Sequence, residues 1–294
     1  NPLLMSLLCE SVATRNANLL RYSMEKRFAI TPGCAWLNYI RSHDDIGWGF
    51  DNDDALEVGL NPNDHRRFLT SFYVGKHEST FAEGELFQEA PETGDARVCG
   101  TTASLCGLGR ALELKAEEER EFAIRRILLM HGVTFTIGGI PLIYLGEEIG
   151  SLNDSGYRDE FDKADDSRWF HRSRFDCDNA ELRSDAESVE HQIYQGFLKL
   201  IQLRLNNAAL ATGETQIVNP DNDHVFAYFR TSPEQNVLCL ANMSEQTQSV
   251  KAPRLRQLGL KKVLVDIIAG QTVIAARQLE MEPLQFMVLL RQGG

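Results

Sequence analysis

At residues 35–45 the chain reads AWLNYIRSHDD, and this stretch decides the fold class. Residues 35–40 are largely apolar and have the length and composition of a buried strand. The strand leads directly into the polar residues 41–45. Parallel α/β proteins place their sites at the C-terminal ends of strands, so the sequence predicts an α/β fold with a site at this strand end.

Helical and strand-like segments alternate outward from this stretch. Residues 2–28 carry apolar residues at helical spacing, which predicts one amphipathic helix. Further helices are predicted at residues 62–73, 101–114, 116–130 and 191–206, and a second strand at residues 141–145. A parallel (β/α)8 barrel needs eight strands, so residues 1–211 are predicted to be the C-terminal part of such a barrel. Within them, residues 46–100 are far too long for an ordinary βα loop and are predicted to form an extended loop subdomain.

The pattern changes near residue 212. Strand-like segments separated by turn residues follow at residues 226–230, 237–242, 263–266 and 285–290. Consecutive short strands of this kind are typical of antiparallel sheets. Residues 212–294 are therefore predicted to form a small C-terminal antiparallel β-sandwich domain.

Composition excludes several classes of function. The net charge of -12 disfavours nucleic acid and anionic membranes as partners, because both require clustered Lys and Arg. The longest apolar stretch, residues 127–145, is interrupted by His131, three glycines and Pro141, so no membrane span is predicted. The six cysteines show no metal-binding spacing and are expected to be mostly buried thiols in a reducing compartment. The chain begins Asn-Pro without Met, which suggests a start created by cloning or cleavage. A cytoplasmic location is expected.

The polar segments after the strands are the candidates for chemistry. A carboxylate at Asp44 would point into the mouth of a barrel, where it can stabilise positive charge on a sugar ring, and His43 can hold sugar hydroxyls. The alternative is that both residues cap the following turn. Arg97 and Arg168 lie in long loops and can donate to a sugar or form surface ion pairs. At the second strand end, structural hydrogen bonding is favoured over catalysis for the glutamates at 147 and 148.

Five segments in this order resemble the amylosucrases, a branch of the α-amylase family of glycoside hydrolases. They comprise residues 38–48 (NYIRSHDDIGW), 64–66 (DHR), 93–98 (TGDARV), 141–148 (PLIYLGEE) and 165–169 (DDSRW). The similarity extends over nearly the whole chain, including the C-terminal β region. Each motif is modest alone, but the combination is highly specific.

The resemblance implies a retaining mechanism, in which an Asp nucleophile forms a covalent glucosyl intermediate and a Glu acts as acid and then base. On matching positions, Asp44 is the third carboxylate, which stabilises the transition state. His43 matches the histidine that holds glucosyl hydroxyls. Asp45, Arg97 and Arg168 match residues that shape the pocket and contact the fructosyl side. No metal ion or organic cofactor is implied.

The family's nucleophile and acid/base lie after the fourth and fifth barrel strands, upstream of any residue here, so this chain by itself is expected to be inactive. The long segment of residues 47–100 resembles the subdomain that enlarges the loop after strand 7 and narrows the pocket. Exposed barrel edges are expected to promote self-association.

For the whole enzyme, the resemblance implies glucosyl transfer from sucrose to an α-1,4-glucan, with release of fructose. Sucrose hydrolysis or another α-amylase-family glucosidase activity is the nearest alternative. The alternative from a different functional class is that the protein is not an enzyme but a non-catalytic fragment or a carbohydrate-binding module.

Overall fold

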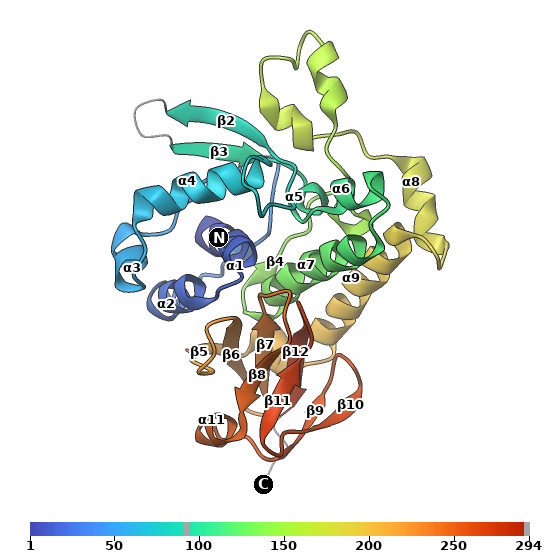
Figure 1. Ribbon diagram of the computed structural model, residues 1–294. Helices are drawn as coiled ribbons and strands as arrows, with labels where there is room; N and C mark the ends of the chain where they lie inside the picture. Colours follow the sequence, from blue (N-terminus) through green and yellow to red (C-terminus); the bar gives the residue numbers. More distant parts are fainter. Residues whose placement is uncertain (91–94, 291–294) are drawn as a thin grey trace.

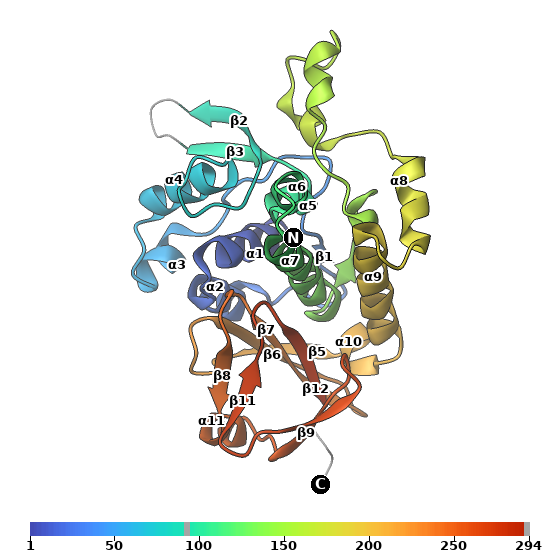
Figure 2. The ribbon, with the colours of Figure 1, turned by 45° about the vertical axis from the view of Figure 1, so that its right-hand side comes forward.

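The computed structural model describes residues 1–90 and 95–290. The strands that follow residue 213 gather at one end of the molecule (Figure 1). The two strands β2 (Glu85–Ala90) and β3 (Asp95–Cys99) lie at the opposite end, and helices occupy the space between (Figure 2). In the described part of the chain, every helix is too short or too polar to cross a membrane.

The N-terminal segment forms two helices, α1 (Pro2–Thr14) and α2 (Asn18–Arg27). The prediction of one helix over residues 2–28 is therefore wrong. Arg15 ends α1 in the left-handed conformation, with φ of 56°, and its backbone N–H donates to Ser11 O. The Asn16 side chain then accepts a hydrogen bond from Asn18 N (2.8 Å). Both helices bury apolar residues, so the apolar spacing continues across the turn and hides it.

Two short strands pair in parallel, as expected for an α/β fold: β1 (Leu37–Asn38) and β4 (Ile140–Pro141). Both are shorter than predicted, because residues 35–36, 39–40 and 142–145 lie outside them. Ile140 N donates to Trp36 O (2.7 Å) and Leu142 N donates to Asn38 O (2.8 Å). These two strands do not close a barrel in the described residues, so the eight-stranded barrel stays a prediction. Leu37 and Ile140 are 44% and 57% exposed. The self-association expected at such edges also stays a prediction.

The segment between β1 and β4 contains the predicted helix over residues 62–73, which is confirmed. The Asn61 side chain caps this helix by accepting from Asn63 N and Asp64 N (3.1 Å each). The last helix before β4 begins with three glutamates in its first turn, which favours helix formation, and it continues past the predicted end at residue 130. The helices here are α3 (Asn52–Glu57), α4 (Pro62–Tyr73), α5 (Thr102–Leu105), α6 (Leu108–Glu113) and α7 (Glu117–Thr136).

A long connection follows β4, and its first part protrudes beside β2 and β3 (Figure 1). It contains short 3-10 turns, two of which, η2 and η3, are capped by the side chains of Asp154 and Asp166. The elements are η1 (Glu147–Ile149), η2 (Ser155–Asp159), η3 (Ser167–His171), α8 (Cys177–Glu181), η4 (Leu182–Ser184), α9 (Val189–Leu205) and α10 (Ala208–Thr212). Helix α9 corresponds to the helix predicted over residues 191–206.

The C-terminal strands form an antiparallel sheet of order β10-β9-β12-β7-β6-β5 and a two-stranded ribbon β8-β11. One apolar cluster joins Val225 and Leu240 of the sheet to Val250 and Leu279 of the ribbon. The predicted antiparallel β region is thus confirmed. Its elements are β5 (Glu214–Val218), β6 (Val225–Thr231), β7 (Asn236–Asn242), β8 (Gln248–Lys251), α11 (Ala252–Gln257), β9 (Val263–Asp266), β10 (Gln271–Ile274), β11 (Gln278–Met281) and β12 (Phe286–Leu290).

All six cysteines are free thiols. Four are buried, namely Cys9, Cys99, Cys106 and Cys239, as the sequence predicts, whereas Cys34 and Cys177 are exposed. Burial raises the pKa of the Cys9, Cys99 and Cys239 thiols to about 12. These thiols therefore stay protonated and pack as small apolar groups.

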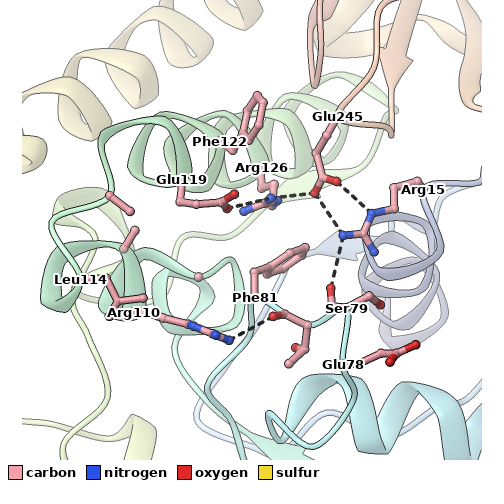
Figure 3. A pocket seen from close by; sticks show the side chains of 14 residues that line it. Arg15, Glu78, Ser79, Phe81, Arg110, Leu114, Glu119, Phe122, Arg126 and Glu245 are labelled. Atoms are coloured by element: carbon pink, nitrogen blue, oxygen red, sulfur yellow. Dashed lines mark hydrogen bonds and ion pairs between the residues drawn. The ribbon is translucent and has the colours of Figure 1, made fainter.

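Glu245, between β7 and β8, joins the C-terminal strands to the helices (Figure 3). Its carboxylate lies 3.0 Å from Arg15 Nε and 2.7 Å from Arg126 Nη2. Arg126 is 2% exposed, and its guanidinium carbon lies 3.7 Å from the ring centre of Phe81. These residues border a cavity of about 330 Å³. Glu245 pairs with both guanidiniums at once. We therefore interpret these residues as a structural link between the C-terminal strands and the helices.

The substitution Glu245→Gln is expected to destabilise the protein by about 2 kcal/mol, because it leaves the buried Arg126 guanidinium without its nearest carboxylate. Urea unfolding monitored by circular dichroism measures this change. Glu282→Gln is the matched control, since Glu282 pairs with the neighbouring Arg125 but is 70% exposed. Equal stability of the two variants would contradict the assignment of Glu245 as a buried link.

Candidate active site

Asp44 lies in the loop that leaves the C-terminal end of β1, where the sequence predicts a site. Its side chain is 56% exposed and borders a pocket of about 540 Å³. Asp45, Arg97 and Arg168 border the same pocket, so the structure brings together four of the five predicted site residues. A volume of this size is within the usual range for a small-molecule site.

His43 is the fifth predicted residue, and its side chain does not line this pocket. The imidazole is 65% exposed, and its Nε2 lies 3.7 Å from Asp44 Oδ2. Its backbone is more firmly held, because His43 O accepts a hydrogen bond from Arg172 Nε (2.5 Å). The role of the His43 side chain in holding sugar hydroxyls stays a prediction.

Two guanidiniums face the Asp44 carboxylate. Arg168 Nη1 lies 3.5 Å and Arg172 Nη2 lies 3.6 Å from Asp44 Oδ1. Arg168 is oriented by Asp166, which accepts from its Nε and Nη2 (2.9 Å each), and this hydrogen bonding lowers the pKa of Asp166. Arg168 also stacks on Phe87, with 4.9 Å between its guanidinium carbon and the ring centre. Both cations therefore lie on one side of the Asp44 carboxylate, at ion-pair distance.

Arg172 was not predicted from the sequence. It follows Arg168 by one helical turn in a run with several arginines, and nothing in that run distinguishes a guanidinium that points to Asp44 from one that points to solvent. The loop conformation makes this distinction, because η3 ends at His171 and directs Arg172 back to His43.

Arg97 comes from β3 and pairs with Asp45, with 3.4 Å between Nη1 and Oδ2. The Asp45 side chain is 9% exposed, whereas that of Arg97 is 55% exposed. Ile46 N donates to Val98 O (2.8 Å), so the Asp45 loop is tied to the strand that carries Arg97. The motif residues Thr93 and Gly94 lie outside the described residues.

Strands β2 and β3 also supply a wall of the pocket. Phe87 and Gln88 line it, next to a bulge that shifts the register between Phe87 and Ala90. Gln88 has a φ of 51°, a left-handed conformation that is typical of such bulges and re-aims the neighbouring side chains. The narrowing of the pocket by the long segment stays a prediction.

Arg66 supports the loop that follows Asp45. It donates from Nε to Trp48 O (3.1 Å) and from Nη2 to Phe50 O (2.8 Å). Trp48 Nε1 in turn donates to Thr70 Oγ1 (2.9 Å). The sequence marks Arg66 only as part of a motif, and these contacts give it a structural role.

Arg41 and Glu147 form a buried ion pair beneath the site, each 3% exposed. Glu147 Oε1 also accepts from Thr102 N (3.3 Å), and Arg41 stacks on Tyr144, with 4.5 Å to the ring centre. Burial alone would raise the pKa of Glu147, but the charges of Arg41 and His131 lower it below its ordinary value. Glu147 thus has the structural role that the sequence favours. In the described residues no group of three or more His, Cys, Asp or Glu side chains could hold a metal ion.

Comparison with known proteins finds similarity over parts of the chain. Residues 215–288 match the family described as Maltogenic Amylase, C-terminal domain. Glucosylglycerate phosphorylase of Spirochaeta thermophila is 27% identical over 166 residues, which cover 54% of this chain and 28% of the relative. Alpha-amylase 3 of Dictyoglomus thermophilum is 25% identical over 131 residues, which cover 42% of this chain and 26% of the relative. The chain thus matches little more than a quarter of the length of either protein.

Two solved structures share the fold. Sucrose 6F-phosphate phosphorylase from Thermoanaerobacter thermosaccharolyticum has a TM-score of 0.56 at 17% identity, covering 83% of this chain and 43% of that one. AmyP in complex with maltose has a TM-score of 0.50 at 18% identity, and the match covers 65% of this chain and 38% of AmyP. The finer resemblance to amylosucrases is not shown by these relatives. The match over residues 215–288, together with their antiparallel sheet, shows that this part of the chain is similar to the C-terminal domain of maltogenic amylases.

Proposed function

We propose that this chain belongs to an enzyme that transfers the glucosyl group of sucrose to an α-1,4-glucan and releases fructose, with retention of configuration. The observation that carries the proposal is the pocket in which Asp44 meets Arg97 and Arg168 at the C-terminal end of β1. The similarity to a glucosylglycerate phosphorylase and to an alpha-amylase supports it, as does the order of the sequence motifs.

In this mechanism Asp44 stabilises the positive charge that develops on the glucosyl ring, and it is not the nucleophile. Arg168 and Arg172 lie at ion-pair distance from its carboxylate and orient it. Arg97, held by Asp45, and the exposed edge of Arg168 donate hydrogen bonds on the fructosyl side. The resemblance assigns the nucleophile and the acid/base to no residue of this chain, so the full-length product of the gene is the enzyme to be tested.

The test is incubation of that full-length protein with sucrose alone, with glycogen, or with inorganic phosphate. Glucosyl transfer predicts fructose release in excess of free glucose, and an added glycogen acceptor grows. Equal amounts of glucose and fructose under all conditions would show hydrolysis instead. Two of the similar proteins are phosphorylases, so phosphate is included as a candidate acceptor. A glucosyl phosphate product in that incubation would show phosphorolysis. No fructose under any condition would exclude action on sucrose.

A further inference from the structure

His171 is a buried histidine, 1% exposed, at the end of η3. Its Nδ1 accepts a hydrogen bond from Gly100 N (3.1 Å), and its Nε2 lies 3.3 Å from His43 O. A backbone N–H can only donate and a carbonyl can only accept. Nδ1 must therefore be unprotonated while Nε2 carries the hydrogen, so these two contacts require one neutral tautomer.

The surroundings of His171 favour this neutral form. Burial, followed by the charges of Arg41 and Arg172, lowers the pKa of His171 to about 4, although hydrogen bonding to His43 and the Glu147 carboxylate act in the opposite direction. Arg41 is close because its Nη1 donates to His171 O (3.0 Å). At neutral pH the ring is thus an uncharged link with a fixed donor and a fixed acceptor.

The link joins the three segments that carry the proposed site. The His43 carbonyl precedes Asp44 directly, Gly100 follows the strand that carries Arg97, and His171 itself closes the turn that begins with Ser167 and contains Arg168. The three segments are far apart in the sequence, with separations of 71 and 128 residues between the bonded partners. One imidazole thus bonds to the segments that carry Asp44 and Arg97 from within the turn that contains Arg168, and Arg172 Nε is a second donor to the same His43 carbonyl.

We infer that His171 is a positioning residue of the proposed glucosyl-transfer site: its Nε2–H holds the His43 carbonyl and thereby sets the place of the Asp44 carboxylate. The inference rests on the proposed function for its kinetic consequence. Small displacements of a transition-state-stabilising group are costly, because an error of about 1 Å lowers rates by up to about 100-fold.

Two substitutions test the two hydrogen bonds of His171 one at a time, because each keeps one bond and removes the other. The amide of an Asn at position 171 reaches the place of Nδ1 and keeps the acceptor for Gly100, while the amide of a Gln reaches the place of Nε2 and keeps the donor to His43. In the full-length protein, His171→Asn is expected to lower kcat for sucrose by about 100-fold with little change in KM, and His171→Gln to lower kcat by about threefold. His191→Asn, which changes a histidine on α9 whose Nδ1 bonds Arg183 O, is the matched control and should leave kcat unchanged.

A merely structural role predicts a different result, because both substitutions at position 171 would then lower stability and activity together. Equal kcat values for the Asn and Gln variants would overturn the inference. A wild-type protein that releases no fructose would instead overturn the proposed function, and the inference is then tested without catalysis. Hydrogen exchange of residues 41–46 should be faster in His171→Asn than in His171→Gln, and unchanged exchange would refute the link.

Nitrogen NMR of the wild-type imidazole keeps the inference testable if the variants fail to fold. The expected spectrum shows an unprotonated Nδ1 and a protonated Nε2 at neutral pH. The opposite tautomer cannot donate to the His43 carbonyl, and a charged ring cannot accept a hydrogen bond from Gly100 N. Either result would overturn the assignment.

Discussion

Asp44→Asn in the full-length protein is expected to lower kcat for sucrose by about 10² to 10³-fold, while KM changes little. The Asn side chain has the same size and fills the same place beside Arg168 and Arg172, but it carries no negative charge. Charge on the glucosyl ring develops in the transition state and not in bound sucrose, so the loss falls on kcat.

Fructose release over a range of sucrose concentrations separates kcat from KM for this variant. Asp162→Asn is the matched control, because Asp162 is exposed on the protruding segment and does not border the pocket. The control should retain wild-type kinetics. If Asp44→Asn kept more than about a tenth of the wild-type kcat, the role of Asp44 as the stabilising carboxylate would be wrong.

Arg41→Met is expected to destabilise the fold by about 3–5 kcal/mol, because it leaves the buried Glu147 carboxylate without its cation. One oxygen of Glu147, Oε2, already has no hydrogen-bond partner among the described residues, and Oε1 would keep only the hydrogen bond from Thr102 N. The substitution also removes the hydrogen bond from Arg41 to His171 O.

The double variant Arg41→Met with Glu147→Leu should recover much of this stability, since no unpaired charge is then buried. Urea unfolding of both variants measures the difference. Arg120→Met is the control, because Arg120 pairs with Glu117 at the surface and its loss should cost less than about 1 kcal/mol. If Arg41→Met also cost less than about 1 kcal/mol, Arg41 and Glu147 would not be a buried pair in which each charge depends on the other.

Several elements could be predicted because their signals are local. Asn61 and Pro62 are a local signal for the start of α4, and the helix covers the predicted residues 62–73. Alternation and turn residues likewise marked the strands β6, β7, β9 and β12. The break at Arg15 was missed because the apolar spacing does not change there, although the backbone does.

The candidate site was predicted only in part. Asp44, Asp45, Arg97 and Arg168 were found because they belong to quoted motifs, and they share one pocket. His171 and Arg172 were missed, since their importance lies in where the turn of η3 points them.

The sequence by itself determined the strand at β1, the C-terminal strands β6, β7, β9 and β12, and the kinds of side chain at the strand ends, because periodicity and capping act between near neighbours in the chain. Only the tertiary structure decided which of these side chains meet. His171 bonds to groups 71 and 128 residues away, and Arg41 pairs with Glu147 across 106 residues. Such contacts depend on how separate segments pack and on which charges are buried together, and no local pattern encodes that packing.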